Sequence, residues 1–393
     1  MRRLTGIVRA YAWGSPTAIP ELLGREPTGE PQAEYWLGAH PLAPSLVETP
    51  EGDVELNDYL SSHPEFVGDR CLTAFGDRFP VLMKLLASER PLSLQAHPDR
   101  EQAEAGFARE EEAGISLDAP ERTYRDDWPK PELILALTPF DALCGFRKAA
   151  DTVSLFERLG VADELASVIG PLTKRKGSAA MAEVFLDILS LDDAASADHC
   201  LKAARSHTED DDDLGEFART VALLDAYFPG NPGVLAALML NRVHLEPGEA
   251  LYLPPRTMHA YLRGNGVEVM ACSDNVVRGG LTSKHINVDE LIHIVDFSSS
   301  TPERTATEDD GGFTRYLAPA PEFAVWRGEL SSQPLRLPRP NACRVMLVID
   351  GDATLKDDDD TLTLGVGEAA LIPYGEDVTV TGTATVFVGS PGV

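Results

Sequence analysis

Two stretches of the sequence share one pattern, and this pattern decides the fold. The first is GEALYLPPRTMH, from Gly248 to His259, and the second is GEAALIPYGEDV, from Gly367 to Val378. Each has a glycine, five residues with an apolar strand core, a proline, and four more residues before its last position. An internal repeat of this kind indicates two related units in one chain. The first copy ends on a histidine, whereas the second ends on a valine.

Both copies resemble the second sequence motif of cupin barrels, G-x5-P-x-G-x2-H. The first copy has Arg256 in place of the motif's second glycine, and the second copy keeps Gly375 but lacks the histidine. The resemblance implies two small jelly-roll β-barrels. Because a turn before a strand can point one imidazole into a barrel, the first unit can bind a metal through His259. The second unit lacks this ligand, so we expect a structural role for it.

Outside the repeat, the sequence changes character along the chain. Residues 1–148 are rich in Pro, Gly and short apolar runs, which is typical of strands joined by loops. The segment that follows almost lacks Pro and has apolar residues at spacings of three and four, which is typical of amphipathic helices. We therefore expect a mainly β fold with an α-helical insert. A catalytic cupin domain (1–148 and 236–314), a helical domain (149–235) and a C-terminal cupin domain without metal ligands (315–393) are predicted.

The composition excludes several classes of protein. The chain has 393 residues, of which 43% are hydrophobic and 25% charged, so it can bury two or three cores. Its net charge of -29 would repel nucleic-acid backbones and anionic membranes. No apolar stretch reaches the roughly 20 residues of a transmembrane helix, and the start lacks the apolar core of a signal peptide. We expect a cytoplasmic monomer that binds neither nucleic acid nor membranes.

The cysteines and the acidic runs do not indicate metal sites. The five cysteines show no CxxC pairing, so we expect reduced core residues rather than disulfides or a thiolate zinc site. The acidic runs that begin at Glu209 and Asp357 lack the spacing of an EF-hand, so we interpret them as solvated loops. A bound metal would then take its ligands from His, carboxylate and amide side chains.

Three short segments supply such ligands. RPLSLQAHPD places Gln95 and His97 two residues apart, which on a strand sends both side chains to the same face. In WPKPELILAL, Glu132 opens an apolar run that resembles a strand. With His259, these residues form a mixed nitrogen and oxygen set that suits Zn²⁺ and is compatible with other divalent ions. Spacing alone does not choose these two among the nine histidines.

A family resemblance makes that choice. Ordered motifs of the chain resemble those of the type I phosphomannose isomerases: YAWGS at Tyr11, AEYWLGAHPLAPS at Ala33, FPVLMKLLASERPLSLQAHPD at Phe79, KPE at Lys130, FDALCGFR at Phe140, MHAYL at Met258 and SDNVVRGGLTSK at Ser273. The resemblance implies interconversion of mannose 6-phosphate and fructose 6-phosphate, which serves GDP-mannose synthesis or glycolysis. It also implies one Zn²⁺ per chain, held by Gln95, His97, Glu132 and His259. No nucleotide cofactor is implied.

The chain departs from the family pattern at one place. The family usually has Asn-His before KPE, whereas this chain has Trp128 and Pro129. A histidine that has been considered for proton transfer is therefore absent. Either that histidine is dispensable or the activity is reduced.

The reaction moves a proton between C2 and C1 and develops negative charge on the sugar oxygens, which fixed cations stabilise. By the resemblance, Arg278 serves the active site, and Lys130 and Glu268 are joint candidates for the base. The predicted substrate contacts are Trp13, Glu34, Lys84, Ser93, Tyr261, Asp274 and Lys284. Arg278 and Lys284 could instead pair with the nearby acids Asp274, Asp289 or Glu290, as most surface cations do.

Two other functions remain open at this point. One is another metal-dependent cupin enzyme, such as an iron oxygenase; the Gln95 amide and the SDNVVRGG segment argue against it. The other is a cupin that binds a sugar phosphate without turning it over. The missing histidine before Lys130 is the feature that favours it.

Overall fold

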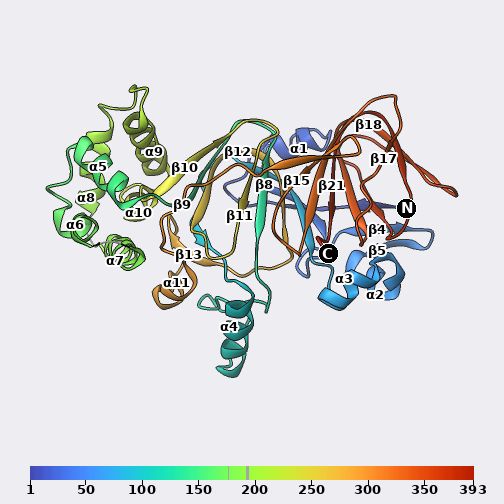
Figure 1. Ribbon diagram of the computed structural model, residues 1–393, viewed down its shortest axis with the longest axis horizontal. Coiled ribbons are helices and arrows are strands. Elements are labelled where there is room, and N and C mark those ends of the chain that lie inside the picture. Colours follow the sequence, from blue (N-terminus) through green and yellow to red (C-terminus); the bar gives the residue numbers. More distant parts are fainter. Residues whose placement is uncertain (176, 192–193) are drawn as a thin grey trace.

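The computed structural model describes residues 1–175, 177–191 and 194–393 and consists of two β-sheet units and a group of helices in one row (Figure 1). The helices lie at one end, the first β unit in the middle and the second at the other end. The fold is therefore mainly β with a helical insert, as predicted. No helix in the described ranges is long and apolar enough to cross a membrane.

The first unit is a ten-stranded sheet in which one long strand makes most of the connections. This strand, β12 (His259–Ala271), pairs with β6, β7, β8 and β9, so it joins most strands of the sheet. Every residue of β6 (Val81–Ser88) is buried, as expected for a central strand. The remaining strands are β2 (Ile7–Arg9), β3 (Glu34–Gly38), β7 (Leu94–Ala96), β8 (Glu132–Ala136), β9 (Phe140–Phe146), β10 (Leu240–Leu245), β11 (Ala250–Leu253) and β13 (Val277–Gly280).

The second unit is an eleven-stranded sheet centred on β18 (Arg344–Lys356) and β21 (Thr379–Ser390). Its other strands from the C-terminal part are β14 (Thr307–Asp310), β15 (Phe313–Tyr316), β16 (Ala324–Leu330), β17 (Leu335–Arg336), β19 (Thr361–Leu364) and β20 (Ala369–Ile372). Apolar side chains of both sheets, such as Met83 and Phe387, share one core cluster. The two units therefore pack against each other.

The sheets exchange strands in a way that differs from the expected division. Strand β1 (Arg2–Thr5) pairs with β20, and β4 (Leu46–Thr49) and β5 (Gly52–Glu55) continue from it, so three strands of residues 1–148 belong to the second sheet. Strand β14 also belongs there, although its residues lie within 236–314. The cause is main-chain pairing, which does not depend on sequence distance. The division into three domains stays a prediction.

The helical insert shares a core with the first sheet. Its helices are α5 (Ala149–Leu159), α6 (Ala166–Lys174), α7 (Ser178–Leu189), α8 (Ala194–Ala204), α9 (Asp213–Tyr227) and α10 (Gly233–Ala237). Phe185 of α7 packs edge-on against Phe146 of β9, with ring centroids 5.4 Å apart. The apolar faces of these amphipathic helices therefore bury themselves partly on the barrel.

Helices also interrupt the part of the chain for which strands and loops are expected. They are α1 (Ala18–Leu22), α2 (Leu56–Ser62), α3 (Asp69–Phe75), α4 (Arg100–Glu112), α11 (Val288–Ile294) and a 3-10 turn at Pro64–Phe66. Helix α4 begins with a capping box in which Asp99 accepts from the backbone of Gln102, and the Gln102 side chain accepts from the backbone of Asp99. This pairing satisfies two free N–H groups at the helix start.

The repeat places an acid and a base at equivalent positions. Leu253, at the end of the first copy's strand, pairs with Glu132. Ile372, its counterpart in the second copy, pairs with Arg344. The Arg344 side chain is buried and donates to the backbone oxygens of Pro338, Pro373 and Glu376. The Arg344 guanidinium thus stabilises the loop that follows β20. In the first copy of the repeat, the equivalent loop follows β11 and ends at His259.

Candidate active site

Three side chains form a buried cluster at the mouth of the first sheet. His97 follows β7, Glu132 opens β8 and His259 opens β12. The Nε2 atoms of His97 and His259 lie 3.3 and 3.2 Å from the two carboxylate oxygens of Glu132. Each residue offers a ligand atom within 4.8 Å of the others. This geometry suits one metal ion.

The backbone orients both imidazoles. Nδ1 of His97 lies 2.6 Å from the carbonyl oxygen of Asn275, and Nδ1 of His259 lies 2.9 Å from that of Thr257. Because a carbonyl only accepts, each Nδ1 carries the proton and each Nε2 presents a lone pair. Both Nε2 atoms and one Glu132 oxygen are buried without a hydrogen-bond partner. Buried polar atoms rarely stay unpaired, so these residues fit a metal.

The charge of the cluster is set by burial and by one lysine. Burial and the neighbouring Lys130 lower the pKa of His97 to about 4, so this imidazole is neutral. Burial alone would raise the pKa of Glu132, but His97 and Lys130 hold it well below its usual range. The Lys130 ammonium lies 3.2 Å from Glu132. Neutral imidazoles and an ionised carboxylate are the ligand forms that metal binding needs.

Gln95 lies beside the cluster. It is in β7, its backbone pairs with His259 on one side and with Arg278 on the other, and it lines the adjacent cavity. The cavity has a volume of about 620 Å³, which suits a ligand the size of a hexose phosphate. The predicted residues that line it are Trp13, Glu34, Lys84, Ser93, Gln95, Lys130, Glu132, Tyr261, Glu268, Asp274, Arg278 and Lys284.

A second buried charge network lies along one wall of this cavity. Nζ of Lys84 is 2.9 Å from a carboxylate oxygen of Glu268 and 3.4 Å from one of Glu34. The Tyr261 hydroxyl donates to the other oxygen of Glu268 at 2.8 Å, and the indole of Trp36 donates to Glu34 at 2.8 Å. All five residues lie on the central strands β3, β6 and β12, whose pleat directs these side chains inward.

This network fixes the protonation of its members. Burial would lower the pKa of Lys84, but Glu268 and Glu34 raise it, so the side chain is a cation. Burial raises the pKa of Glu268, and the nearby carboxylates act in the same direction, whereas Lys84 opposes them. Burial and the Glu268 charge also raise the pKa of Tyr261, so this phenol keeps its proton. The carboxylate of Glu268 therefore sits between two donors.

The cavity also carries two cations, Arg278 and Lys284, that have no acidic partner in the described part of the chain. Burial and the charge of Arg125 lower the pKa of Arg278, and the charge of Arg278 lowers that of Lys284. Of the three acids that could have neutralised them, Asp274 lies 3.3 Å from His40, Glu290 contacts Arg109, and Asp289 forms no ion pair with either cation. A dianionic group such as a phosphate would relieve this repulsion.

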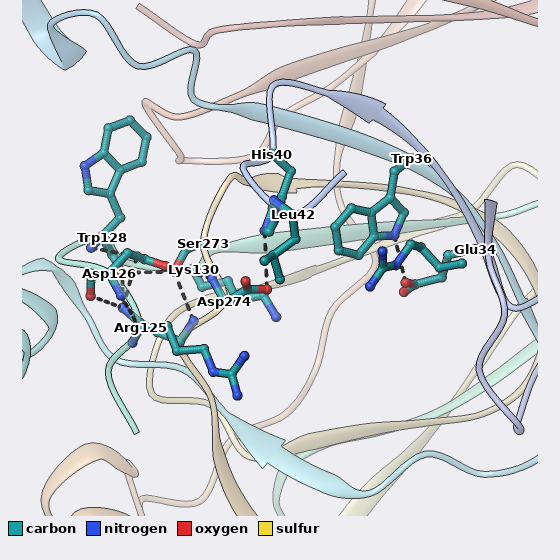
Figure 2. A network of polar contacts seen from close by, with 12 residues as sticks. Glu34, Trp36, His40, Leu42, Arg125, Asp126, Trp128, Lys130, Ser273 and Asp274 are labelled. Carbon is teal, nitrogen blue, oxygen red and sulfur yellow. Dashed lines mark hydrogen bonds and ion pairs between the residues drawn. The ribbon is translucent and has the colours of Figure 1, made fainter. Parts of the chain in front are cut away.

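Asp274 belongs to a polar layer behind the cavity (Figure 2). Its backbone N–H donates to Asp126, and Ser273 and Trp128 donate to the same carboxylate. The Leu42 backbone N–H donates to Nδ1 of His40, so Nε2 of His40 is the atom that donates to Asp274. The layer holds Asp274 in place from two sides.

Sequence reasoning missed several residues of the cavity. Tyr11, Arg90, Tyr227 and Phe228 also line it, and the Arg90 guanidinium lies over the Tyr227 ring at 5.9 Å. Tyr227 ends helix α9, so the helical insert contributes to the site. The sequence signal for two of them was that Tyr11 and Arg90 lie in family motifs. Conversely, Trp128 does not line this cavity but packs against Phe75 and Arg78.

Comparison with known proteins identifies the family. Residues 1–149 match the family model described as phosphomannose isomerase type I, catalytic domain. The chain is 38% identical to the mannose-6-phosphate isomerase of Escherichia coli over 390 residues, with 97% of each chain covered. The chain belongs to the type I phosphomannose isomerase family. The family extends to the human mannose-6-phosphate isomerase, which is 31% identical over 83% of this chain and 81% of its own.

Solved structures of this family share the whole fold. A zinc-bound mannose 6-phosphate isomerase has a TM-score of 0.90 and 33% identity, covering 100% of this chain and 99% of its own. A mutant phosphomannose isomerase from Salmonella typhimurium also has a TM-score of 0.90 and 33% identity, with both chains fully covered. The family likeness therefore includes the helical insert and the C-terminal sheet.

Proposed function

We propose that this protein is a zinc-dependent isomerase that interconverts mannose 6-phosphate and fructose 6-phosphate. The observation that carries the proposal is the cluster of His97, Glu132 and His259, whose buried Nε2 and carboxylate atoms lack partners beside a sugar-sized cavity. The relatives named mannose-6-phosphate isomerase support the substrate. The zinc-bound structure among them supports the metal.

The proposed metal ligands are Gln95, His97, Glu132 and His259, for one ion per chain. When bound, Zn²⁺ supplies a Lewis acid that polarises the sugar oxygens near C1 and C2. The chain prepares the site by holding both imidazoles in the Nδ1-protonated tautomer. Lys130 keeps Glu132 ionised.

Arg278 and Lys284 are proposed to hold the substrate's anionic groups. Both line the cavity, and the charge of Arg278 lowers the pKa of Lys284, a repulsion that a bound anion would relieve. Ser93 is proposed as a further hydrogen-bond donor. On the opposite wall, Glu34, Trp13 and Asp274 are proposed to accept from or pack against the sugar.

For the proton transfer, Glu268 and Lys130 remain the two candidates. Glu268 lines the cavity as a carboxylate whose pKa is raised by burial, which suits a base, and Tyr261 can donate to it or to a sugar oxygen. The ammonium of Lys130 is already engaged by the carboxylate of Glu132, 3.2 Å away, inside the proposed metal cluster. We therefore place Glu268 first.

The test combines metal analysis with a coupled assay of mannose 6-phosphate conversion, before and after chelation and zinc return. We expect about one zinc per chain and an activity that disappears and returns with the metal. Arg278→Ala should keep the zinc and lose at least about 100-fold in kcat/KM, whereas Glu132→Ala should lose both. Zinc with sugar phosphate binding but no turnover would instead support a non-catalytic cupin, and bound iron with oxygen uptake would support an oxygenase.

The same experiment separates the two bases. Glu268→Gln should abolish turnover and leave zinc and substrate binding in place if Glu268 is the base. Lys130→Met should then retain measurable turnover. The reverse pattern would assign the proton transfer to Lys130.

We also propose that the protein acts as a monomer in the cytoplasm and binds no nucleic acid. Its cysteines are all free thiols, four of them buried, which agrees with a reducing compartment. Light scattering of the purified protein tests the monomer: a mass near 42.5 kDa is expected.

A further inference from the structure

A second cavity lies behind the proposed active site. It has a volume of about 430 Å³, large enough for a small organic molecule. Asp274 lines both cavities, and His40, which donates to it, lines the second one, so these two side chains lie between the cavities (Figure 2). None of the predicted metal ligands lines the second cavity.

Apolar side chains make up much of its surface. Leu60 of α2, Phe79 and Trp128 form buried parts of the lining. Leu42 and Leu117 lie at the rim and are 58% and 48% exposed, which is unusual for leucine. Trp128 is also one of the two residues at which this chain departs from its family's motif. The cavity therefore suits a ligand with an apolar ring system.

One polar atom in the lining lacks a partner. Asn57, on helix α2, lines the cavity, and its side-chain oxygen Oδ1 is buried without a hydrogen bond. A buried acceptor without a donor is costly, so native proteins rarely keep one. A ligand that brings an N–H or O–H donor would remove this cost.

The charges around the cavity favour a cation. Arg78 is neutralised by two contacts with Asp127, at 2.7 and 3.1 Å. The Asp126 carboxylate accepts hydrogen bonds from Trp128 and from three consecutive residues, 273–275, and Asp274 is paired with His40.

Three exposed charges of the lining remain: Asp77, Asp118 and Arg125. None of them has an ion-pair partner among residues 1–175, 177–191 and 194–393. The two acids outnumber the one base, and the whole chain is strongly acidic. A positively charged donor therefore fits better than an anionic ligand.

From these observations we propose that the second cavity is a binding site for a small aromatic amine. Its ring system would lie among Leu60, Phe79 and Trp128, and its ammonium group would donate to Oδ1 of Asn57. The site is separate from the proposed isomerase site, so its test does not depend on turnover.

The experiment measures the affinity of three probes that share an indole ring: tryptamine with an ammonium, tryptophol with a hydroxyl, and indole-3-acetate with a carboxylate. Calorimetry of the full-length, zinc-loaded protein is done with saturating mannose 6-phosphate, which keeps the first cavity filled. We expect one tryptamine per chain, weaker binding of tryptophol, and at least about tenfold weaker binding of indole-3-acetate.

Variants locate the site. Asn57→Leu should weaken tryptamine at least about tenfold without lowering the stability, because it removes an unpaired acceptor. Ser61→Trp should fill the rim and abolish binding, since Ser61 lines the cavity. Ser62→Trp is the matched control: Ser62 is exposed and adjacent but outside the lining, so binding should persist.

Three results would overturn the proposal. One is the absence of saturable tryptamine binding, and another is equal affinity for the amine and the carboxylate. The third is undiminished binding in Ser61→Trp. If Asn57→Leu does not fold, the two tryptophan variants still decide the location.

Discussion

We expect the replacement of Lys84 to lower the stability of the first β unit strongly. It is buried, and its ammonium is 2.9 Å from Glu268 and 3.4 Å from Glu34. At an effective dielectric constant of about 20, these separations correspond to about 6 and about 5 kcal/mol of attraction, offset by several kcal/mol of desolvation. Lys84→Met leaves two buried carboxylates without a cation, so we expect a loss of about 3 to 5 kcal/mol at neutral pH.

The loss of stability in Lys84→Met should also depend on pH. Without Lys84, the already raised pKa of Glu268 should rise further. A carboxyl whose pKa is higher in the folded than in the unfolded protein favours folding when protonated, and this contribution is lost as the pH rises. The deficit of Lys84→Met should therefore be small near pH 5 and larger at pH 8.

Urea denaturation of the metal-free protein at both pH values, followed by tryptophan fluorescence, measures the effect. The double variant Lys84→Met with Glu268→Gln serves as the control and should recover at least about 2 kcal/mol, because it removes one unpaired charge. A deficit below about 1 kcal/mol at pH 8, or a double variant no more stable than the single one, would refute the reasoning.

Three further predictions concern separate features. Lys284→Met should raise the KM for mannose 6-phosphate by about 10- to 100-fold with little change in zinc content, as seen in the coupled assay; an unchanged KM would contradict its role at the phosphate. Metal-free protein should lose about 3 kcal/mol of stability as the pH falls from 6.5 toward 4. Burial lowers the pKa of His97 to about 4 in the folded protein, so in this pH range the histidine gains a proton in the unfolded chain but not in the folded one. His97→Gln should flatten that dependence in urea titrations. Arg344→Met should destabilise the second barrel by about 3 kcal/mol or more while isomerase activity per folded molecule stays constant; a loss of zinc would show that the barrels are more tightly coupled.

Three of the four metal ligands that the family resemblance selects, His97, Glu132 and His259, lie together in the structure, and each stands in a recognisable local segment. His259 ends a repeated motif, and Glu132 stands at the first position of an apolar run that forms β8. Gln95 and His97 lie in one short segment. Gln95 lies in β7 and His97 directly follows it, whereas Glu132 opens β8 and His259 opens β12. Because β12 pairs with both β7 and β8, these residues come close together.

The strand exchange could not be predicted in the same way. Strand β1 has the sequence RRLT, in which only Leu4 is apolar and buried, and nothing in these four residues identifies β20 as the partner strand. The place of Tyr227 in the cavity is likewise a long-range contact, set by how α9 docks on the barrel. Helix α4 is different, because Asp99 and Gln102 form a recognisable capping box in a segment interpreted from its composition alone.

The buried Arg344 makes the second β unit a reference against which the metal's contribution to stability can be measured. Its positive charge is attached covalently, so no chelator can remove it and no shortage of metal can leave its site empty. A chelation series should then lower the unfolding midpoint of one barrel while that of the other stays where it was. The separation between the two transitions would report how much of the folding free energy the metal contributes, measured against a barrel of the same architecture in the same chain.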